Sequence, residues 1–450
     1  MAKDNAKEFL QSEETCLIDE NDTTEKQKLK RKYTTASKCR RTVVFVSCIV
    51  QIIICSGVGY GLSVMYAELV IVFNAKRAEA AVIQSLFMGL SGVSGIIFTG
   101  MIHKFGPGAC IMFGGLVGCI GMFVCAFARG LILIILCTGI VAGTAFGLCY
   151  LAAFVTVGWM FKNSASFFLI CLMAGISIGQ FILPLLFESF ISQYSWSGAF
   201  ILVSAVSLNC IPGGLTIHYS DKFFINTKEM SGTKSNANCD VNFLKDIVMW
   251  IILVNCLLIS MTVNVEAWFI VDHMVTRGFT RESGSVLVST MGIGSLMGRV
   301  SGALLRLYCK CPTFYHWVYL CVIIGGLHAV IINLNNFWAL VAACIAYGIT
   351  FATTGSQIPA IMFESVGLER YPQAMGMANL LCGVGELIGP FLGGYIYDIF
   401  GVYDTAFYAA SAISAYISLA TLFAAVLVRR RNLRETRTKV DTKVKYKTIK

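Results

Sequence analysis

Long apolar runs alternate with short polar segments along nearly the whole chain. We identify twelve such runs, each near the roughly 20 residues that a helix needs to cross the hydrocarbon core of a bilayer. They lie at residues 43–69, 80–101, 109–128, 131–157, 166–187, 199–217, 246–271, 284–305, 314–333, 337–361, 374–397 and 405–428. The pattern therefore predicts an all-α membrane protein with twelve transmembrane helices.

The two halves of the chain carry a common pattern. From Pro184 the sequence reads PLLFESFISQYSWSGAFILVSAVS, and from Pro390 it reads PFLGGYIYDIFGVYDTAFYAASAIS. The offset is 206 residues at the proline and 207 beyond it, and Val-Ser-Gly at 93–95 and 300–302 repeats the offset of 207. We therefore expect two six-helix pseudo-repeats. The predicted order is basic tail, bundle, linker, bundle and basic tail, at residues 1–42, 43–217, 218–245, 246–428 and 429–450.

Glycines recur every four residues in several predicted helices, which places them on one helix face. These seams are Gly139, Gly143 and Gly147; Gly175 and Gly179; Gly294, Gly298 and Gly302; and Gly385, Gly389 and Gly393. A glycine face lets a second backbone approach closely. Two interpretations are open: ordinary close packing, and helices that pack tightly yet slide, as a rocking carrier requires.

The distribution of Lys and Arg residues predicts how the chain is oriented in the membrane. Of the 35 Lys and Arg residues, 29 lie in the tails and the predicted inward loops, five lie in the outward loops, and Arg299 lies within a span. This asymmetry predicts that both termini are cytoplasmic. The net charge of +10 then describes tails that face anionic lipid, and it does not indicate a nucleic-acid partner.

Residues that would carry catalysis are not found in a recognisable arrangement. The five histidines have no metal-ligand spacing, and neither a nucleophile elbow nor a phosphate-binding loop occurs. The sequence thus predicts no metal, no cofactor and no enzymatic activity. Disulfides are not expected either, because none of the 18 cysteines lies in an outward loop.

Three ionisable residues stand at membrane depth: Arg299, Glu386 and Glu266. A charge at mid-bilayer costs about 2.5 to 3.5 kcal/mol on insertion scales, so such residues usually face a cavity or one another. Arg299 lies seven residues before Arg306, the inward end of its helix, or about 10 Å along the axis. We favour a cavity role for Arg299; a structural ion pair and a side chain that reaches the interface are the alternatives.

The two glutamates have several possible roles. Glu386 could be the counter-ion of Arg299, a proton carrier, or a neutral acid hydrogen-bonded in a helix seam, since burial disfavours the charged carboxylate. Glu266 lies five residues before Asp272, at the outer end of its predicted helix, so surface exposure is an equal alternative for it.

Several motifs together resemble the monocarboxylate transporters of the major facilitator superfamily, over nearly the whole span from helix 1 to helix 12. The sharpest is GLERYPQAMGMANLLCGVGELIGPFLGGYIYDIFGVYDTAFY, at 367–408. GWMFKNSASFFLICLMAGISIG at 158–179, YSWSGAF at 194–200 and MGRVSGALL at 297–305 are also similar. The resemblance implies the major facilitator fold and solute transport.

The chain departs from that family's pattern at the residues that couple protons. Arg299 matches the family's substrate-binding arginine, but the aspartate expected four residues earlier is Ser295, and the helix 1 lysine aligns with Val64. Proton-coupled members are thought to use that lysine and aspartate. Lactate-proton symport is therefore in doubt.

The cytoplasmic motifs are also reduced. Phe161 and Lys162 remain from the family's helix 5 motif, but Asn163 and Ser164 follow in place of basic residues. His103 and Lys104 stand where the superfamily usually has an acidic-basic pair. The resemblance gives these residues a gating role.

From these observations we expect an alternating-access carrier in the plasma membrane. Arg299 would bind the carboxylate of a small organic anion, Ser295 and Asn264 would be polar neighbours, and transport would be facilitative or coupled through Glu386. A larger aromatic or amphiphilic acid is an alternative, with Tyr60, Tyr66, Phe154 and Trp268 lining its pocket. A non-transporting sensor on the same fold is another. The family also implies a possible single-span immunoglobulin-like chaperone.

Overall fold

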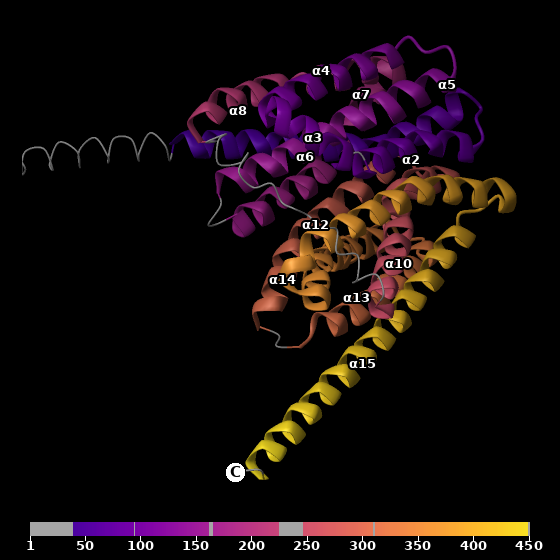
Figure 1. Cartoon of the computed structure of the whole chain (residues 1–450). Coiled ribbons are helices and arrows are strands. Elements are labelled where there is room, and N and C mark those ends of the chain that lie inside the picture. The colour runs from indigo at the N-terminus through magenta and orange to yellow at the C-terminus, as the bar shows by residue number, and fades with distance from the viewer. Residues whose placement is uncertain (1–38, 94, 162–164, 225–245, 309–310, 449–450) are drawn as a thin grey trace, which may run out of the picture.

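Two helical bundles packed side by side make up the molecule (Figure 1). The computed structural model describes residues 39–93, 95–161, 165–224, 246–308 and 311–448. Each bundle comes from one half of the chain, and the described residues contain no strand. The predicted all-α class is confirmed. Nine helices within the described residues are long and apolar enough to cross a bilayer.

The first bundle covers the six predicted spans of the N-terminal half. It begins with a helix at Cys39–Val72. The elements that follow are α2 (Arg77–Val93), α3 (Gly95–Phe105), α4 (Pro107–Cys125), α5 (Leu131–Ile134), the π-helix η1 (Ile135–Ala142), α6 (Gly143–Met160), α7 (Ala165–Ser207) and α8 (Cys210–Phe224). Ser195, with φ 61° and ψ 177°, breaks α7 into the fifth and sixth spans.

The second bundle repeats this arrangement. Its helices are α10 (Ile247–Thr262), α11 (Val265–Thr276), α12 (Arg281–Tyr308), α13 (Thr313–Asn333), α14 (Phe337–Phe400) and α15 (Asp404–Thr448). The tenth and eleventh predicted spans are joined in α14, and the seventh span is divided between α10 and α11 at Val263 and Asn264.

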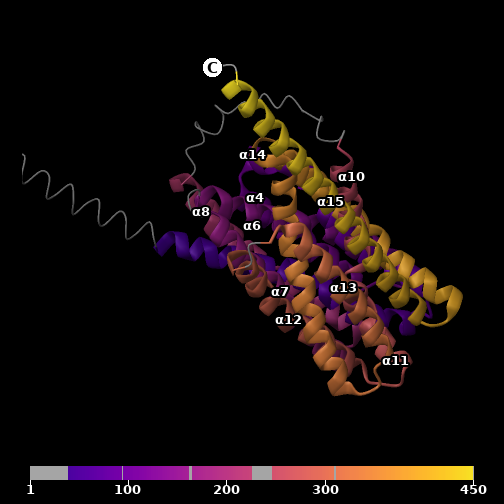
Figure 2. The same cartoon turned by 90° about the horizontal axis from the view of Figure 1, so that it is seen from below.

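Two helices extend beyond the predicted boundaries. α8 continues to Phe224, into the segment predicted as a linker, whose residues 225–245 lie outside the described part of the chain. α15 continues through residues predicted as a tail, and Figure 2 shows it running past α13 and out of the bundle. Within the described residues, the polar composition of the C-terminal tail thus does not end the helix.

Asp246 fixes the start of α10. Its carboxylate accepts a hydrogen bond from the Val248 backbone N–H at 2.9 Å, and the Arg431 guanidinium of α15 donates to the same side chain. These bonds, the one from Arg431 first, hold the pKa of Asp246 below its ordinary value. The cap therefore ties the beginning of the second bundle to the end of its last helix.

The glycine seams are sites of close backbone approach, as predicted. A Cβ atom at Gly294 or Gly298 would overlap a carbonyl oxygen of α14, at Ile345 or Ile349 respectively. A Cβ atom at Gly389 would overlap the Met261 carbonyl of α10. In the first bundle, Gly179 lies against the Ile53 carbonyl in the same way. Close contact is thus shown for these seams, and sliding remains a hypothesis.

Two names describe the ends of the bundles. The distal end contains the turns at 73–76, 277–280 and 401–403, and lies to the right in Figure 1. The proximal end is the end at which the Cys39–Val72 helix begins.

Candidate functional site

Arg299 lies between the two bundles. Its Nε donates a hydrogen bond to Ser177 Oγ of α7 at 2.9 Å, and Ser177 Oγ lies 2.9 Å from Ser295 Oγ, one turn before Arg299 on α12. Both serines are fully buried. A hydroxyl from the N-terminal half thus holds the guanidinium next to the serine that replaces the expected aspartate. No sequence pattern marks Ser177, because only the packing of α7 on α12 brings it next to Arg299.

The positive charge of Arg299 has no carboxylate partner within ion-pair distance among the described residues. The side chain is half-buried, as is that of Glu386. The expected counter-ion pair of Arg299 and Glu386 is therefore not formed in this conformation. A guanidinium with free donors beside a pair of hydroxyls can bind an anion.

Tyr60 and Tyr150 connect Arg299 with Glu386. Each phenol interacts electrostatically with both of these charged groups. Glu386 lies on α14, where its Oε2 would be 3.8 Å from a Cβ atom at Gly92 of α2. Glu386 therefore lies where α14 meets α2, and the two phenols lie near it and near Arg299. Tyr150, whose ring lies 4.8 Å from that of Phe154, was not anticipated from the sequence.

Glu266 and Asn264 lie elsewhere. Glu266 is fully buried in α11 and pairs with His328 of α13, so the surface-exposed alternative is wrong. Asn264 lies at the break between α10 and α11 with 8% of its surface exposed, and no hydrogen bond to Arg299 is found among the described residues. Of the two proposed polar neighbours of Arg299, Ser295 thus lies near it and Asn264 does not hydrogen-bond to it.

The predicted gating residues are described only in part. Phe161 ends α6, and its ring stacks on Phe168 with centroids 3.8 Å apart. Lys104 is exposed, with Nζ 5.2 Å from the centre of the Phe105 ring. Lys162 and the side chain of His103 lie outside the described residues.

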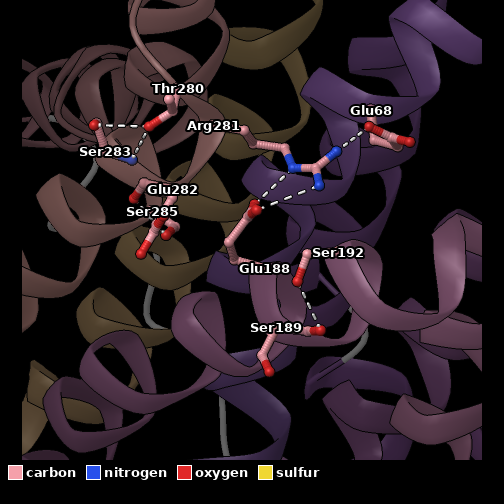
Figure 3. A network of polar contacts seen from close by, with 9 residues as sticks. All are labelled: Glu68, Glu188, Ser189, Ser192, Thr280, Arg281, Glu282, Ser283 and Ser285. Atoms are coloured by element: carbon pink, nitrogen blue, oxygen red, sulfur yellow. Dashed lines mark hydrogen bonds and ion pairs between the residues drawn. The ribbon is translucent and has the colours of Figure 1, made fainter.

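Arg281 joins the bundles at the distal end (Figure 3). This α12 residue donates from Nε to Glu188 of α7 at 2.6 Å, and it also pairs with Glu68 of the Cys39–Val72 helix. Only 20% of the Arg281 side chain is exposed. One cation of the C-terminal half is therefore held by two carboxylates of the N-terminal half.

A second inter-bundle network lies around Asp272 of α11. Arg77 of α2 donates from Nε to Asp272 Oδ2 at 2.8 Å, and the Tyr403 hydroxyl donates to the same carboxylate. The Tyr403 and Tyr66 hydroxyls lie 3.1 Å apart. This network joins the halves next to the Arg281 cluster.

Asp398 of α14 adds a cap across the same interface. Its carboxylate oxygens accept hydrogen bonds from the backbone N–H groups of Arg77 and Ala78, at 3.0 and 2.8 Å. These are the first residues of α2, whose orphan N–H groups need acceptors. The aspartate was quoted above only as part of a family motif, and its role depends on tertiary structure.

Comparison with known proteins identifies the class. The family model of the major facilitator superfamily matches residues 48–315 and 313–448. The chain belongs to the major facilitator superfamily, and it is a multi-pass membrane transporter, not an enzyme. Its solved structural neighbours include a mutant of the nucleoside transporter NupG, with a TM-score of 0.68 and 14% identity over 85% of this chain and 99% of that one. That likeness supports the fold.

The curated relatives are monocarboxylate transporters, as the motifs predicted. Monocarboxylate transporter 13 of Rattus norvegicus is 24% identical over 381 residues, which cover 82% of this chain and 85% of the relative. Monocarboxylate transporter 3 of Rattus norvegicus is 24% identical over 380 residues, covering 82% and 77%. Monocarboxylate transporter 6 of Mus musculus is 22% identical over 394 residues, covering 82% and 83%. The chain is therefore similar to these transporters over most of its length, at low identity.

Proposed function

We propose that the protein is an alternating-access carrier of carboxylate-bearing organic solutes in the plasma membrane. One observation carries this proposal: Arg299 lies between the bundles, is hydrogen-bonded to a serine, and has no carboxylate partner among the described residues. A substrate carboxylate would neutralise it through two parallel hydrogen bonds. The names of the curated relatives support a small monocarboxylate as the first candidate.

The same site suggests further substrate contacts. Ser177 contacts both Ser295 and the Arg299 guanidinium, and Tyr60 interacts electrostatically with Arg299. Asn264 stays a candidate contact, because a helix break in the membrane leaves polar groups available for a solute. Phe161, Lys162, His103 and Lys104 are proposed to act in gating at the proximal end.

The contacts between the bundles at the distal end support alternating access. The charge asymmetry of the loops places the proximal end in the cytoplasm. The Arg281 and Asp272 networks would then close the extracellular side, and both must open before a solute can enter from outside. We further propose that Glu386, beside Tyr60 and Tyr150, takes up a proton if transport is coupled.

The test measures uptake of labelled carboxylates by cells that express the protein, between about pH 5.5 and about pH 8. Arg299→Lys should reduce uptake about tenfold or more, because a lysine cannot hold a carboxylate through two parallel bonds. Exposed Arg129→Lys, at the distal surface, is the matched control for charge and expression. Undiminished uptake in Arg299→Lys would refute the anchor. Glu386→Gln tests proton coupling. If the pH dependence of uptake persists in this variant, Glu386 is not the proton carrier.

A carrier of larger aromatic or amphiphilic acids is the second candidate. Two of the four aromatic residues suggested for its pocket are used in packing: Trp268 is fully buried, and the Tyr66 ring lies 5.7 Å from Phe269. The other two stay candidates: Tyr60 interacts electrostatically with Arg299, and Phe154 packs against Tyr150, which does the same. Competition of aromatic acids and short carboxylates against one labelled solute separates the two candidates.

A non-transporting sensor is the third candidate. Retained signalling without flux in reconstituted vesicles would support it.

A single-span immunoglobulin-like chaperone stays a proposed partner. Its test is whether delivery of the protein to the cell surface depends on co-expression of such a chaperone.

A further inference from the structure

Glu266 and His328 form a second polar centre inside the C-terminal bundle. His328 Nδ1 contacts Glu266 Oε1, and both side chains are completely inaccessible to solvent. Glu266 lies in the first turn of α11, and His328 lies five residues before the end of α13. An isolated charge of either sign would be very unfavourable at such a position. Two titratable groups that share one proton are neutral together.

The pair also has unused hydrogen-bonding atoms. Glu266 Oε2 and His328 Nε2 are buried without a hydrogen-bond partner. Structural ion pairs are usually stabilised by further hydrogen bonds to both groups, and here those bonds are not made. The second nitrogen of the imidazole is therefore available for a hydrogen bond that the protein itself does not supply.

The surroundings connect this pair with the hinge of a broken helix. The Tyr347 ring of α14 lies 5.4 Å from His328, and its hydroxyl donates to the Val263 carbonyl, where α10 ends. Tyr347 and Cys344 of α14 both interact electrostatically with Glu266, and Tyr60 interacts with Tyr347.

Other titratable groups lie on neighbouring segments, and one of them, Arg277 just after α11, donates to the Ile332 carbonyl near the end of α13. Asp272 and His273 lie further along α11, about 9 to 10 Å from Glu266 along the helix axis. α12 contributes Arg299, which faces Tyr60.

The pair is also linked to the distal closure. The twelve-residue helix α11 carries Glu266 near one end and Asp272 near the other. Asp272 is the acceptor of Arg77 and Tyr403, so a movement of α11 would open that network. Such a movement, about the break at Val263 and Asn264, would admit water to His328, about 7.5 Å from the distal end of α13.

We infer that Glu266 and His328 form a proton-binding site, separate from Arg299, which is occluded while the distal end is closed and exchanges its proton when that end opens. The proton enters from water and returns to water, and only O–H and N–H bonds form or break. Its release leaves the carboxylate of Glu266 at the positive end of α11. That this proton moves together with a solute rests on the proposed function.

The site itself can be tested without any substrate. Exchange of the imidazole C2 hydrogen with deuterium, measured by mass spectrometry on the full-length protein in nanodiscs, reports the protonation and exposure of each histidine. We expect His328 to exchange about tenfold more slowly than the partly buried His218 of α8, and the midpoint of its pH profile to move by about one unit or more in Glu266→Gln. His316 is the internal control for the variants, since it is also buried on α13 but lies near the other end of that helix, with Tyr319 and the Cys311 carbonyl as partners.

Two further variants guard against a folding defect in Glu266→Gln. Tyr347→Phe keeps both titratable groups and removes the bond to Val263, so it should speed exchange at His328 and not at His316. Arg281→Gln should do the same by opening the distal end. An identical His328 pH profile in wild type and Glu266→Gln, or unchanged exchange in both other variants, would overturn the inference.

Coupling is tested with whichever labelled carboxylate responds to Arg299→Lys. Glu266→Gln should reduce net uptake about tenfold while solute exchange, which needs no net proton movement, stays within about twofold of wild type. If net uptake and solute exchange fall equally in Glu266→Gln, the Glu266–His328 pair has a structural role and no role in proton coupling. If Arg299→Lys has no effect on any solute, the proposed function fails, but the His328 exchange result stands independently.

Discussion

At the scale of single residues, the chain uses hydroxyl groups where a charge would be expected. Ser295 lies 2.9 Å from Ser177, which accepts the hydrogen bond from Arg299. A serine can orient the guanidinium but cannot neutralise it, so the positive charge stays available for an anion. If Arg299 binds the substrate as proposed, binding takes place without the carboxylate that the related family pattern places on the same helix face.

Ser177→Ala should therefore weaken substrate binding without unfolding the protein. Loss of the hydroxyl removes the hydrogen bond that orients Arg299, which is worth about 1 kcal/mol. The KM of uptake should therefore rise about fivefold with little change in maximal rate. Ser192→Ala is the control, because this serine lies on the same helix and bonds only locally, to the Ser189 carbonyl. A KM equal to wild type would show that Ser177 does not position the anchor.

At the scale of helices, glycine seams set how closely neighbouring helices approach. α12 meets α14 through Gly294 and Gly298, each of which lies against a backbone carbonyl. The pattern was visible in the sequence, because spacing by four places residues on one face of any helix. The partner of each seam was not visible, since it depends on how six helices pack in space.

Gly298→Ala should destabilise the C-terminal bundle by about 1 to 3 kcal/mol, because the added methyl group overlaps the Ile349 carbonyl. Gly326→Ala is the matched control: it lies within α13, where a Cβ atom meets nothing within 4 Å, and the alanine favours the helix. Thermal unfolding monitored by size-exclusion chromatography measures both. Equal midpoints for Gly298→Ala and wild type would show that α12 and α14 adjust freely.

At the scale of the whole molecule, charged groups at the distal end hold the two bundles together. Arg281 bridges to Glu68 and Glu188, and Arg77 bridges to Asp272. Sequence analysis counted both arginines only as outward-loop charges. Their contacts between the bundles became visible only in the folded structure, because each ion pair joins residues that are far apart in the chain.

Arg281→Gln should shift the protein toward a distal-open conformation. Two carboxylates would then lie close together without a cation, which disfavours the closed state. A cysteine introduced at Leu69, a buried residue next to Glu68, should react about fivefold faster with a membrane-impermeant thiol reagent. Exposed Arg129→Gln is the control for loss of charge. The same reaction rate in both variants would exclude Arg281 from the closure.

The sequence by itself determined the helical membrane class, and it singled out the glycine seams and Arg299 as a charge within a span. These follow from local properties: apolar length, helical spacing and the cost of a charge in hydrocarbon. Only the tertiary structure decided the partners. It placed Ser177 beside Arg299, left Glu386 unpaired with that arginine, buried Glu266 against His328 and closed the distal end around Arg281. Such contacts join distant segments, and no local pattern encodes which side chains will meet across two packed bundles.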